Sequence, residues 1–244
     1  MLSDPGLFLA IGLALVHGFL SKLNLFKFLP EHRWISFAGG VSIGYIFIEV
    51  FPELSRAQLE LEHSQLPFVA YLERHVYLLA LLGLLVFYGL DILALASRQR
   101  NRTANPIESS SKAVFWIHIA GFAILNVIVG YLMQEMGRHN WWECVLFFIA
   151  ISLHFFIIDR HLRHHHQHTY DKAGRWILTG AILVGAIIGR SLHFNEAAIA
   201  IVWSFMAGSL ILNILGHELP DEQKSCFGSF ALGAAIYAGL ILAI

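Results

Sequence analysis

The chain has 244 residues, of which 57% are hydrophobic and only 14% are charged, and its mean hydropathy is +0.64. Water-soluble domains carry about a quarter charged residues, so this composition predicts a membrane protein. The formal net charge of -1 excludes a broad basic surface for nucleic acid. The two cysteines, Cys144 and Cys226, do not indicate a disulfide framework.

Eight apolar runs follow one another along the chain. The first begins at Pro5, where Asp4 and Pro5 are typical of a helix start, and its acidic leader favours a retained span over a cleaved secretory signal. Each run approaches the ~20 residues that a membrane-spanning helix needs, and none alternates with a period of two. The sequence therefore predicts an all-α, polytopic membrane protein with eight transmembrane helices, near residues 5–20 (with a looser tail to 29), 34–51, 71–96, 113–136, 141–158, 176–192, 197–215 and 227–244.

The basic residues predict the orientation of these spans. When successive connections are assigned to alternate sides, twelve Lys and Arg residues fall on one side and four on the other. The side with the excess is normally cytoplasmic. Both termini are then expected outside the cytoplasm, and a compact chain of this kind fits the inner membrane of a bacterium.

Two of the predicted spans match each other without gaps at an offset of 168 residues. The segment from Gly40 to Glu53 and the segment from Gly208 to Asp221 each place a polar residue nine positions after the glycine, and proline with an acid at twelve and thirteen. The two spans run in opposite directions, which is the pattern of an inverted repeat and is common in secondary transporters. We expect helices one to three (1–96), a cytoplasmic loop (97–112), a central helix pair (113–159), a histidine-rich cytoplasmic loop (160–173) and helices six to eight (174–244).

The repeated prolines, Pro52 and Pro220, allow two interpretations. Each leaves the carbonyl four residues earlier without its usual donor, and that carbonyl lies beside Glu49 in one copy and His217 in the other, where it could help to hold a cation. Alternatively, proline and acid simply end the helix at the membrane interface. The glycines have a structural interpretation, because small residues four apart mark close helix packing. These are Gly40 and Gly44, Gly185 and Gly189, and the repeated Gly208.

Ionisable residues inside predicted spans are costly and are candidates for function. The oxygen and imidazole groups here suit Zn²⁺ or a similar divalent ion. A neutral histidine bonded to a neighbouring helix is the alternative for each imidazole. His154 and Asp159 lie about 140° apart around one helix, so they are not an obvious chelate. The candidates are His17, Glu49, Asp91, His118, Glu135, His154, Asp159, His193, His217 and Glu218.

A run of five histidines lies on the predicted cytoplasmic side, at His161, His164, His165, His166 and His168. Clustered imidazoles bind divalent metals exchangeably, which suggests a cytoplasmic metal relay. The alternative is a solvated cationic loop that satisfies the positive-inside rule.

The two repeated segments give the chain a resemblance to the ZIP family of divalent-metal transporters. The stretch from Phe37 to Val41 leading to Pro52-Glu53-Leu54 resembles the family's second helix, and Ala207-Gly208 leading to Glu218-Leu219-Pro220-Asp221 resembles its seventh. Eight spans, external termini and a 3+2+3 layout also agree with the family. The resemblance implies uptake of zinc or an iron-group metal through a binuclear site between helices four and five.

The sequence departs from the family at that site. In the fourth helix Asn126 and Gly130 match, but Leu125 and Val129 replace a histidine and an acid. In the fifth helix only His154 and Asp159 match. Phe155 and Ile158 stand there in place of family ligands. The ion path is then either rebuilt, using Glu49, His118, His217 or Glu218 beside the surviving residues, or lost.

Two functions remain open at this stage. The first is a ZIP-like secondary transporter that moves a divalent cation, most simply zinc, toward the cytoplasm, with Asn126, His154 and Asp159 as metal ligands. The second is a ZIP-fold protein that has lost transport and acts as a sensing or interaction module. No zincin or serine-hydrolase motif is present, so an enzyme is not expected. Expected partners are the lipid bilayer and a divalent metal as substrate, with no required cofactor, and the sequence leaves a homodimer open.

Overall fold

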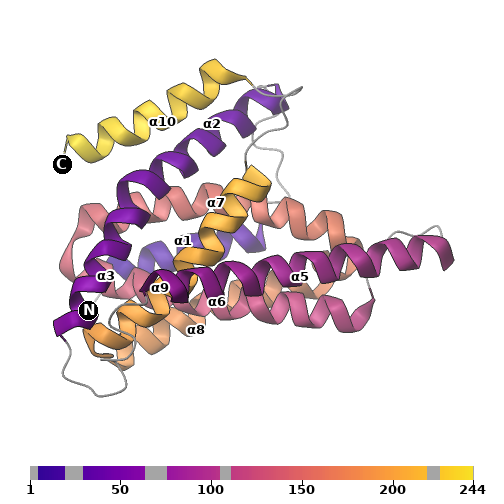
Figure 1. Cartoon of the computed structure of the whole chain (residues 1–244), viewed down its shortest axis with the longest axis horizontal. Coiled ribbons are helices and arrows are strands. Elements are labelled where there is room, and N and C mark those ends of the chain that lie inside the picture. Colours follow the sequence, from indigo (N-terminus) through magenta and orange to yellow (C-terminus); the bar gives the residue numbers. More distant parts are fainter. Residues whose placement is uncertain (1–4, 20–29, 64–75, 105–110, 219–225, 244) are drawn as a thin grey trace. The chain divides into compact units, whose positions relative to one another are not determined.

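A computed structural model of the chain describes residues 5–19, 30–63, 76–104, 111–218 and 226–243. All regular secondary structure in these ranges is helical, as the hydrophobic pattern predicted (Figure 1). The elements are α1 (Pro5–Gly18), α2 (Glu31–Tyr45), η2 (Ile46–Val50), α3 (Phe51–His63), α5 (Val76–Ala104), α6 (Lys112–His139), α7 (Trp141–Thr169), η3 (Tyr170–Gly174), α8 (Arg175–Ser191), α9 (Glu196–Asn213), η4 (Ile214–Glu218) and α10 (Phe227–Leu242), where η denotes π-helical geometry.

Six helical segments are long and apolar enough to cross a membrane. They are His32–Leu59, Val76–Arg100, Lys112–His139, Trp141–Arg163, Tyr170–Ser191 and Glu196–Gly216. The first and last apolar helices, α1 and α10, are shorter, with 14 and 16 described residues. A helix rises about 1.5 Å per residue, so these two described segments alone do not span a hydrocarbon core of ~30 Å. The six long helices indicate an integral multi-pass membrane protein.

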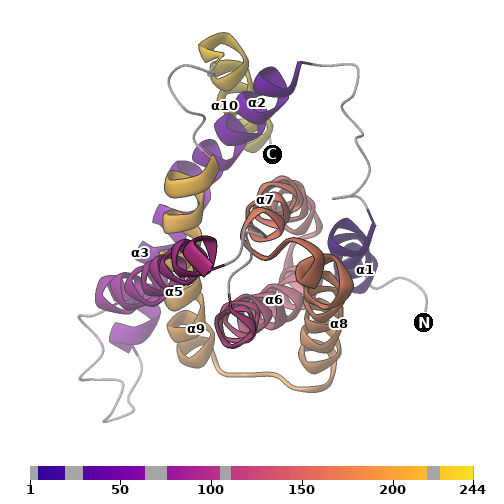
Figure 2. The ribbon, with the colours of Figure 1, turned by 90° about the vertical axis from the view of Figure 1, so that its right-hand side faces the viewer.

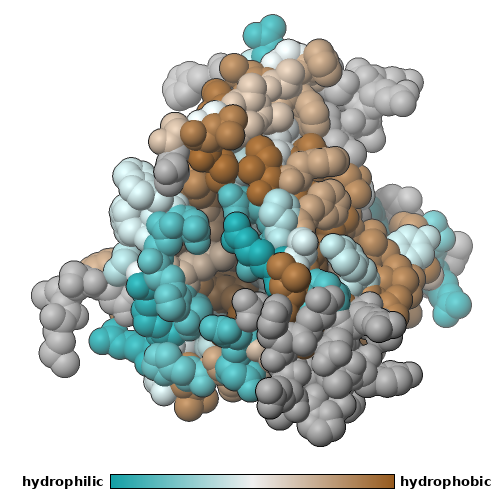
Figure 3. Space-filling model, turned by 60° about the vertical axis from the view of Figure 1, so that its left-hand side comes forward, coloured by the Kyte–Doolittle hydropathy of each residue, from teal (hydrophilic) through white to brown (hydrophobic). Residues whose placement is uncertain are grey.

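The surface supports this assignment. Exposed large apolar side chains recur along α5, including Leu78, Leu81, Leu82 and Leu85, each about half exposed. Contiguous apolar surface of this kind is unfavourable in water but matches lipid tails. Figure 3 shows broad apolar areas on the face in view, beside a polar region.

The described helices fall into two compact units. Unit 1 contains α1, α6, α7, η3, α8 and the part of α5 from Tyr88 onward. Unit 2 contains α2, η2, α3, the part of α5 up to Phe87, α9, η4 and α10. Each unit therefore contains helices that are distant from one another in the sequence.

Unit 1 is a helical bundle in which α1 contacts α6, α7 and α8 (Figure 2). Its tightest crossing joins α6 to α8. A Cβ atom added at Gly130 would collide with the carbonyl oxygen of Ile182, and one added at Gly185 would collide with that of Val127. These glycines let the two backbones approach closely, which is the role that small residues have in membrane helix packing.

Unit 2 contains two helix crossings with matching contacts. In the first, α2 lies beside α10 in both ribbon views, and added Cβ atoms at Gly40 and Gly233 would collide with the carbonyl oxygens of Phe230 and Phe37. The second crossing joins α9 to α5. There, an added Cβ atom at Gly208 would collide with the carbonyl oxygen of Ala80, and one at Gly83 would collide with that of Phe205. Gly208 and Phe205 follow Gly40 and Phe37 by the repeat offset of 168, so the repeat in sequence is also a repeat in packing.

Two of the π-helical segments lie at equivalent positions of the repeat. They are η2 (Ile46–Val50) and η4 (Ile214–Glu218), again 168 residues apart. In the first, the Phe51 N–H bonds to the carbonyl oxygen of Ile46, five residues earlier. Pro52 follows immediately and cannot donate to the ladder, which favours a locally widened turn. Pro220 lies outside the described residues.

The predicted connections are more helical than expected. α5 continues to Ala104, so the predicted loop 97–112 begins as helix. The histidine-rich segment, predicted as the loop 160–173, is also helical, because α7 continues to Thr169 and passes into η3. The prediction of a loop was wrong because residues 160–173 contain neither proline nor glycine, so no residue in the segment breaks a helix.

Candidate functional site

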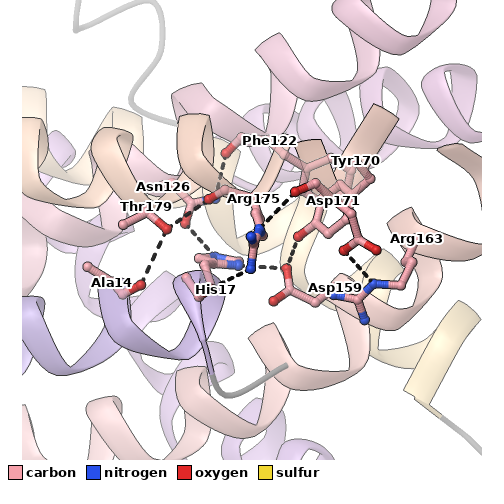
Figure 4. Close-up of polar contacts among 11 residues, drawn as sticks. Ala14, His17, Phe122, Asn126, Asp159, Arg163, Tyr170, Asp171, Arg175 and Thr179 are labelled. Atoms are coloured by element: carbon pink, nitrogen blue, oxygen red, sulfur yellow. Dashed lines mark hydrogen bonds and ion pairs between the residues drawn. The ribbon is translucent and has the colours of Figure 1, made fainter. Parts of the chain in front are cut away.

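A buried polar group occupies the interior of unit 1. It consists of His17 on α1, Asn126 on α6, Asp159 on α7 and Tyr170 on η3 (Figure 4). The side chains of His17, Asp159 and Tyr170 have no measurable exposure, and Asn126 is 2% exposed. The described part of α1 is otherwise apolar, and polar groups buried inside a membrane bundle are costly and are candidates for function.

The imidazole of His17 bridges two oxygen atoms. Its Nδ1 lies 2.7 Å from Asp159 Oδ1, and its Nε2 lies 3.0 Å from Asn126 Oδ1. The Asn126 amide is held in this orientation because its Nδ2 donates to the carbonyl of Phe122 at 2.8 Å. Both oxygens are acceptors, so both ring nitrogens donate only when each carries a hydrogen. The contact between His17 and Asp159 is an ion pair when the imidazole is protonated.

The two carboxyl oxygens of Asp159 differ in their hydrogen bonds. Its Oδ1 accepts hydrogen bonds from His17 and from the Tyr170 hydroxyl. Its Oδ2 is buried and has no hydrogen-bond partner among the described residues. A carboxylate oxygen in this position is costly unless another polar group or an ion satisfies it.

Further polar contacts anchor the end of α1 to the start of α8. Arg175 donates to the carbonyl of Gly18 and to that of Asp171, each at 2.9 Å. Thr179 Oγ1 lies 3.4 Å from the carbonyl of Ala14. A guanidinium at the C-terminal end of a helix also interacts favourably with the helix dipole. These contacts fix the last turn of α1 and hence the position of His17.

A second polar group in unit 1 surrounds His118. His118 Nδ1 lies 2.9 Å from His166 Nε2, and His118 Nε2 lies 3.2 Å from Asp91 Oδ1. His161 Nε2 is 3.8 Å from the same carboxylate oxygen. His118 and His166 are each 1% exposed. The helical form of the histidine-rich segment thus turns two of its members inward, toward α5 and α6.

The remaining predicted residues are distributed as follows. His154 is buried on α7, but the imidazole that bonds Asn126 and Asp159 is that of His17. Glu49 lies half-buried on η2 of unit 2, and His217 and Glu218 belong to η4, where their side chains lie outside the description. The side chains of His164, His165 and His168 also lie outside it. Within the part of the chain that the structure describes, no group of three or more His, Cys, Asp or Glu side chains is arranged to hold a metal ion.

Gly40, Gly44 and Gly208 lie at close crossings in unit 2: an added Cβ at Gly44 would lie 3.3 Å from the Tyr237 ring. Pro52 is exposed after its π turn. The three glycines therefore lie where helices pack closely, and Pro52 lies where the helix geometry changes.

Little in the sequence indicated that two residues, His17 and Tyr170, belong to the buried polar group. His17 was one candidate among ten ionisable residues, with no motif around it. Tyr170 gave no signal, because it follows the polar histidine-rich run in a segment that was predicted as a cytoplasmic loop. Only the packing of α1 against α6 and α7 brings these residues to Asn126 and Asp159.

Comparison with known proteins adds no family assignment. No protein-family model matches the chain, and no curated protein matches it. The resemblance of its second and seventh helices to the ZIP family therefore carries only the weight of the residues quoted for it.

Proposed function

We propose that the protein is a ZIP-like secondary transporter that moves a divalent cation, with zinc as the first candidate, toward the cytoplasm. In this proposal eight helices span the membrane in a 3+2+3 inverted repeat, and both termini lie outside the cytoplasm. A bacterial inner membrane fits the charge distribution. The chain acts as a carrier without a resident cofactor.

The observation that carries the proposal is the repeat in unit 2. The match between the segments beginning at Gly40 and Gly208 extends to their π turns and to their glycine contacts with the neighbouring helices. With the two segments running in opposite directions across the membrane, this is an inverted repeat with an irregular helix in each copy. Such pairs of interrupted helices are typical of secondary transporters.

The buried group of unit 1 supplies the second line of support. An ionisable side chain inside a membrane bundle is rare and is a candidate for binding or transport. Asp159 has no exposure and stands on the helix that, by resemblance, would carry metal ligands. Asn126 stands on the other such helix, and the two side chains bond the same imidazole.

One observation favours the alternative, a non-transporting sensing or interaction module. The apolar residues that replace the family's ligands, Leu125, Val129, Phe155 and Ile158, are all buried, with exposures from 1% to 8%. They fill positions at which the family would place ligands. A transport path must then rely on other residues.

Uptake of Zn²⁺ into liposomes that contain the purified protein tests the proposal. We expect saturable uptake that exceeds protein-free liposomes and that competing Mn²⁺, Fe²⁺, Co²⁺ and Cd²⁺ reduce to different degrees. Asp159→Asn should abolish it, whereas Asp171→Asn, a change at a partly exposed ion pair with Arg163, should retain it.

Uptake by wild-type protein at the rate of protein-free liposomes would contradict transport. Circular dichroism and a cooperative unfolding transition must show that the same preparation is folded. The result would then favour the sensing or interaction module.

A further inference from the structure

We infer that three residues, Asp91, His118 and His166, form a proton-sensitive latch that holds the histidine-rich end of α7 against α5 and α6. The closed latch accommodates at most one imidazolium, and a second proton opens it. In the orientation that the charge pattern predicts, this end of α7 lies on the cytoplasmic side, so the latch responds to cytoplasmic pH. The inference goes beyond the proposed function and holds whether or not the protein transports.

The latch joins three helices of unit 1. Asp91 lies on the part of α5 that belongs to this unit, His118 lies in the first two turns of α6, and His166 lies in the last turn of α7. His118 Nδ1 is 2.9 Å from His166 Nε2, and His118 Nε2 is 3.2 Å from Asp91 Oδ1. The imidazole of His118 thus contacts one side chain on each of the two other helices.

The contact between the two imidazoles depends on their protonation. Two nitrogen atoms 2.9 Å apart form a hydrogen bond only when one carries a hydrogen and the other does not. A neutral imidazole has one donor and one acceptor nitrogen, whereas an imidazolium has two donors. The bond between His118 and His166 therefore forms when both rings are neutral or when one is protonated. When both are protonated, two N–H groups and two positive charges face each other, and the bond is lost.

The surroundings of the two rings make a second positive charge costly. His118 and His166 are each 1% exposed. The ring of Phe122 lies 5.2 Å from that of His118, and the ring of Phe115 lies 5.2 Å from that of His166. A buried charge among apolar side chains needs an opposite charge nearby. Asp91 supplies one negative charge, which suffices for one imidazolium.

The other titratable groups near the latch favour the same limit. The remaining charged or titratable side chains described along these parts of the three helices are Arg98 and Arg100 on α5, Lys112 on α6, and Arg160, His161 and Arg163 on α7. All are basic, and His161 Nε2 lies 3.8 Å from the Asp91 oxygen that His118 contacts. The next acids along the chain, Asp159 and Asp171, contact His17 and Arg163. Asp91 is therefore the carboxylate that neutralises the latch.

The geometry fits protons and not a metal ion. Both ring nitrogens of His118 already face a neighbouring side chain, and the described residues contain no group of three or more His, Cys, Asp or Glu arranged to hold a metal. An ordinary imidazole titrates near pH 6.5, so a histidine pair can change state within the physiological range.

Opening the latch reaches the buried polar group of unit 1. Tyr170 follows His166 by four residues, about one helical turn, and its hydroxyl bonds to Asp159. Loss of the bond between His118 and His166 removes a restraint on the turn that carries Tyr170. Acid is therefore expected to loosen the end of α7 and η3 first.

The test is hydrogen–deuterium exchange of the purified full-length protein in detergent with EDTA, followed by mass spectrometry. Exchange is compared at about pH 7.5 and about pH 5.0, on either side of the ordinary imidazole pKa, with labelling times scaled for the effect of pH on amide chemistry. We expect peptides covering 160–174 to exchange roughly tenfold faster at the lower pH, the effect of losing one hydrogen bond to a charged group. Peptides of α8, in the same unit, should exchange equally at both.

Two variants separate the latch from a general effect of acid. In His166→Gln the side-chain amide can donate or accept, so the contact with His118 survives protonation and the pH dependence of 160–174 should disappear. In His118→Ala the contact is absent, and 160–174 should exchange fast at both pH values. His139→Gln, at an exposed histidine beside Glu135, is the matched control and should behave as the wild type does.

Three results would overturn the inference. The first is equal exchange of 160–174 at the two pH values in the wild type. The second is an unchanged pH dependence in His166→Gln, which would assign the effect to other histidines of the run. The third is equal acceleration in 160–174 and α8, which would show that acid unfolds the whole unit. Should His166→Gln unfold, His118→Asn provides the same test, because its amide oxygen accepts from His166 in either charge state.

Discussion

Buried polar side chains of the two units form hydrogen bonds with different kinds of partner. In unit 2, Ser36, Ser204 and Asn213 donate to carbonyls one turn earlier in their own helices. In unit 1, His17 and His118 bond side chains of other helices. Bonds within one helix leave its neighbours independent, whereas bonds between helices specify which residues meet. Both units use close backbone packing at glycines, and in unit 1 hydrogen bonds between helices also specify which residues meet.

The largest expected effect tests the interior of unit 1. Asp159→Ala removes the counterion of a buried imidazole, so we expect it to lower the free energy of unfolding by roughly 3–5 kcal/mol. Asp171→Ala breaks a partly exposed pair with Arg163 and should cost at most about 1 kcal/mol. Reversible unfolding in mixed micelles measures both. Equal losses would mean that the interior of unit 1 is accessible to water.

The next effect tests the packing of unit 2. Gly40→Ala and Gly208→Ala place a methyl group against a neighbouring backbone carbonyl, and we expect each to destabilise the protein by roughly 1–3 kcal/mol. Gly239→Ala on α10 meets no atom within 4 Å and should be neutral or stabilising. Thermal unfolding in detergent compares the three. A large difference between Gly40→Ala and Gly208→Ala would argue against equivalent crossings.

The smallest expected effect concerns the reactivity of Cys226 and does not change the packing inside either unit. A hydrogen bond from the Ser229 hydroxyl to Cys226 Sγ, 3.3 Å away, lowers the pKa of this thiol just before α10. A lower pKa gives more thiolate at neutral pH, so alkylation should begin at lower pH than for an ordinary cysteine. Ser229→Ala should shift the rate profile to higher pH.

Mass spectrometry of the alkylated protein follows Cys226 separately from the buried Cys144, which should stay unmodified while the protein is folded. An unchanged profile in Ser229→Ala would show that this hydrogen bond does not control the thiol.

The sequence determined the coarse architecture. The apolar runs are helices because each is long, apolar and free of strand periodicity, and these are local properties. The repeat was also readable, because matching residues at one offset need no knowledge of contacts. The helical form of 160–173 was not predicted, since a polar, cationic segment resembles a loop by composition while its residues still favour a helix.

Only the tertiary structure decided which polar residues meet. Asn126, His154 and Asp159 were predicted as metal ligands from their match to the resembled family, but the imidazole that Asn126 and Asp159 contact in the structure is that of His17. His17 is 142 residues from Asp159, and α1 packing against α6 and α7 brings it there. Helical periodicity specifies the face of one helix. The choice of neighbouring face depends on glycine contacts and interhelical hydrogen bonds, which are set by the whole fold.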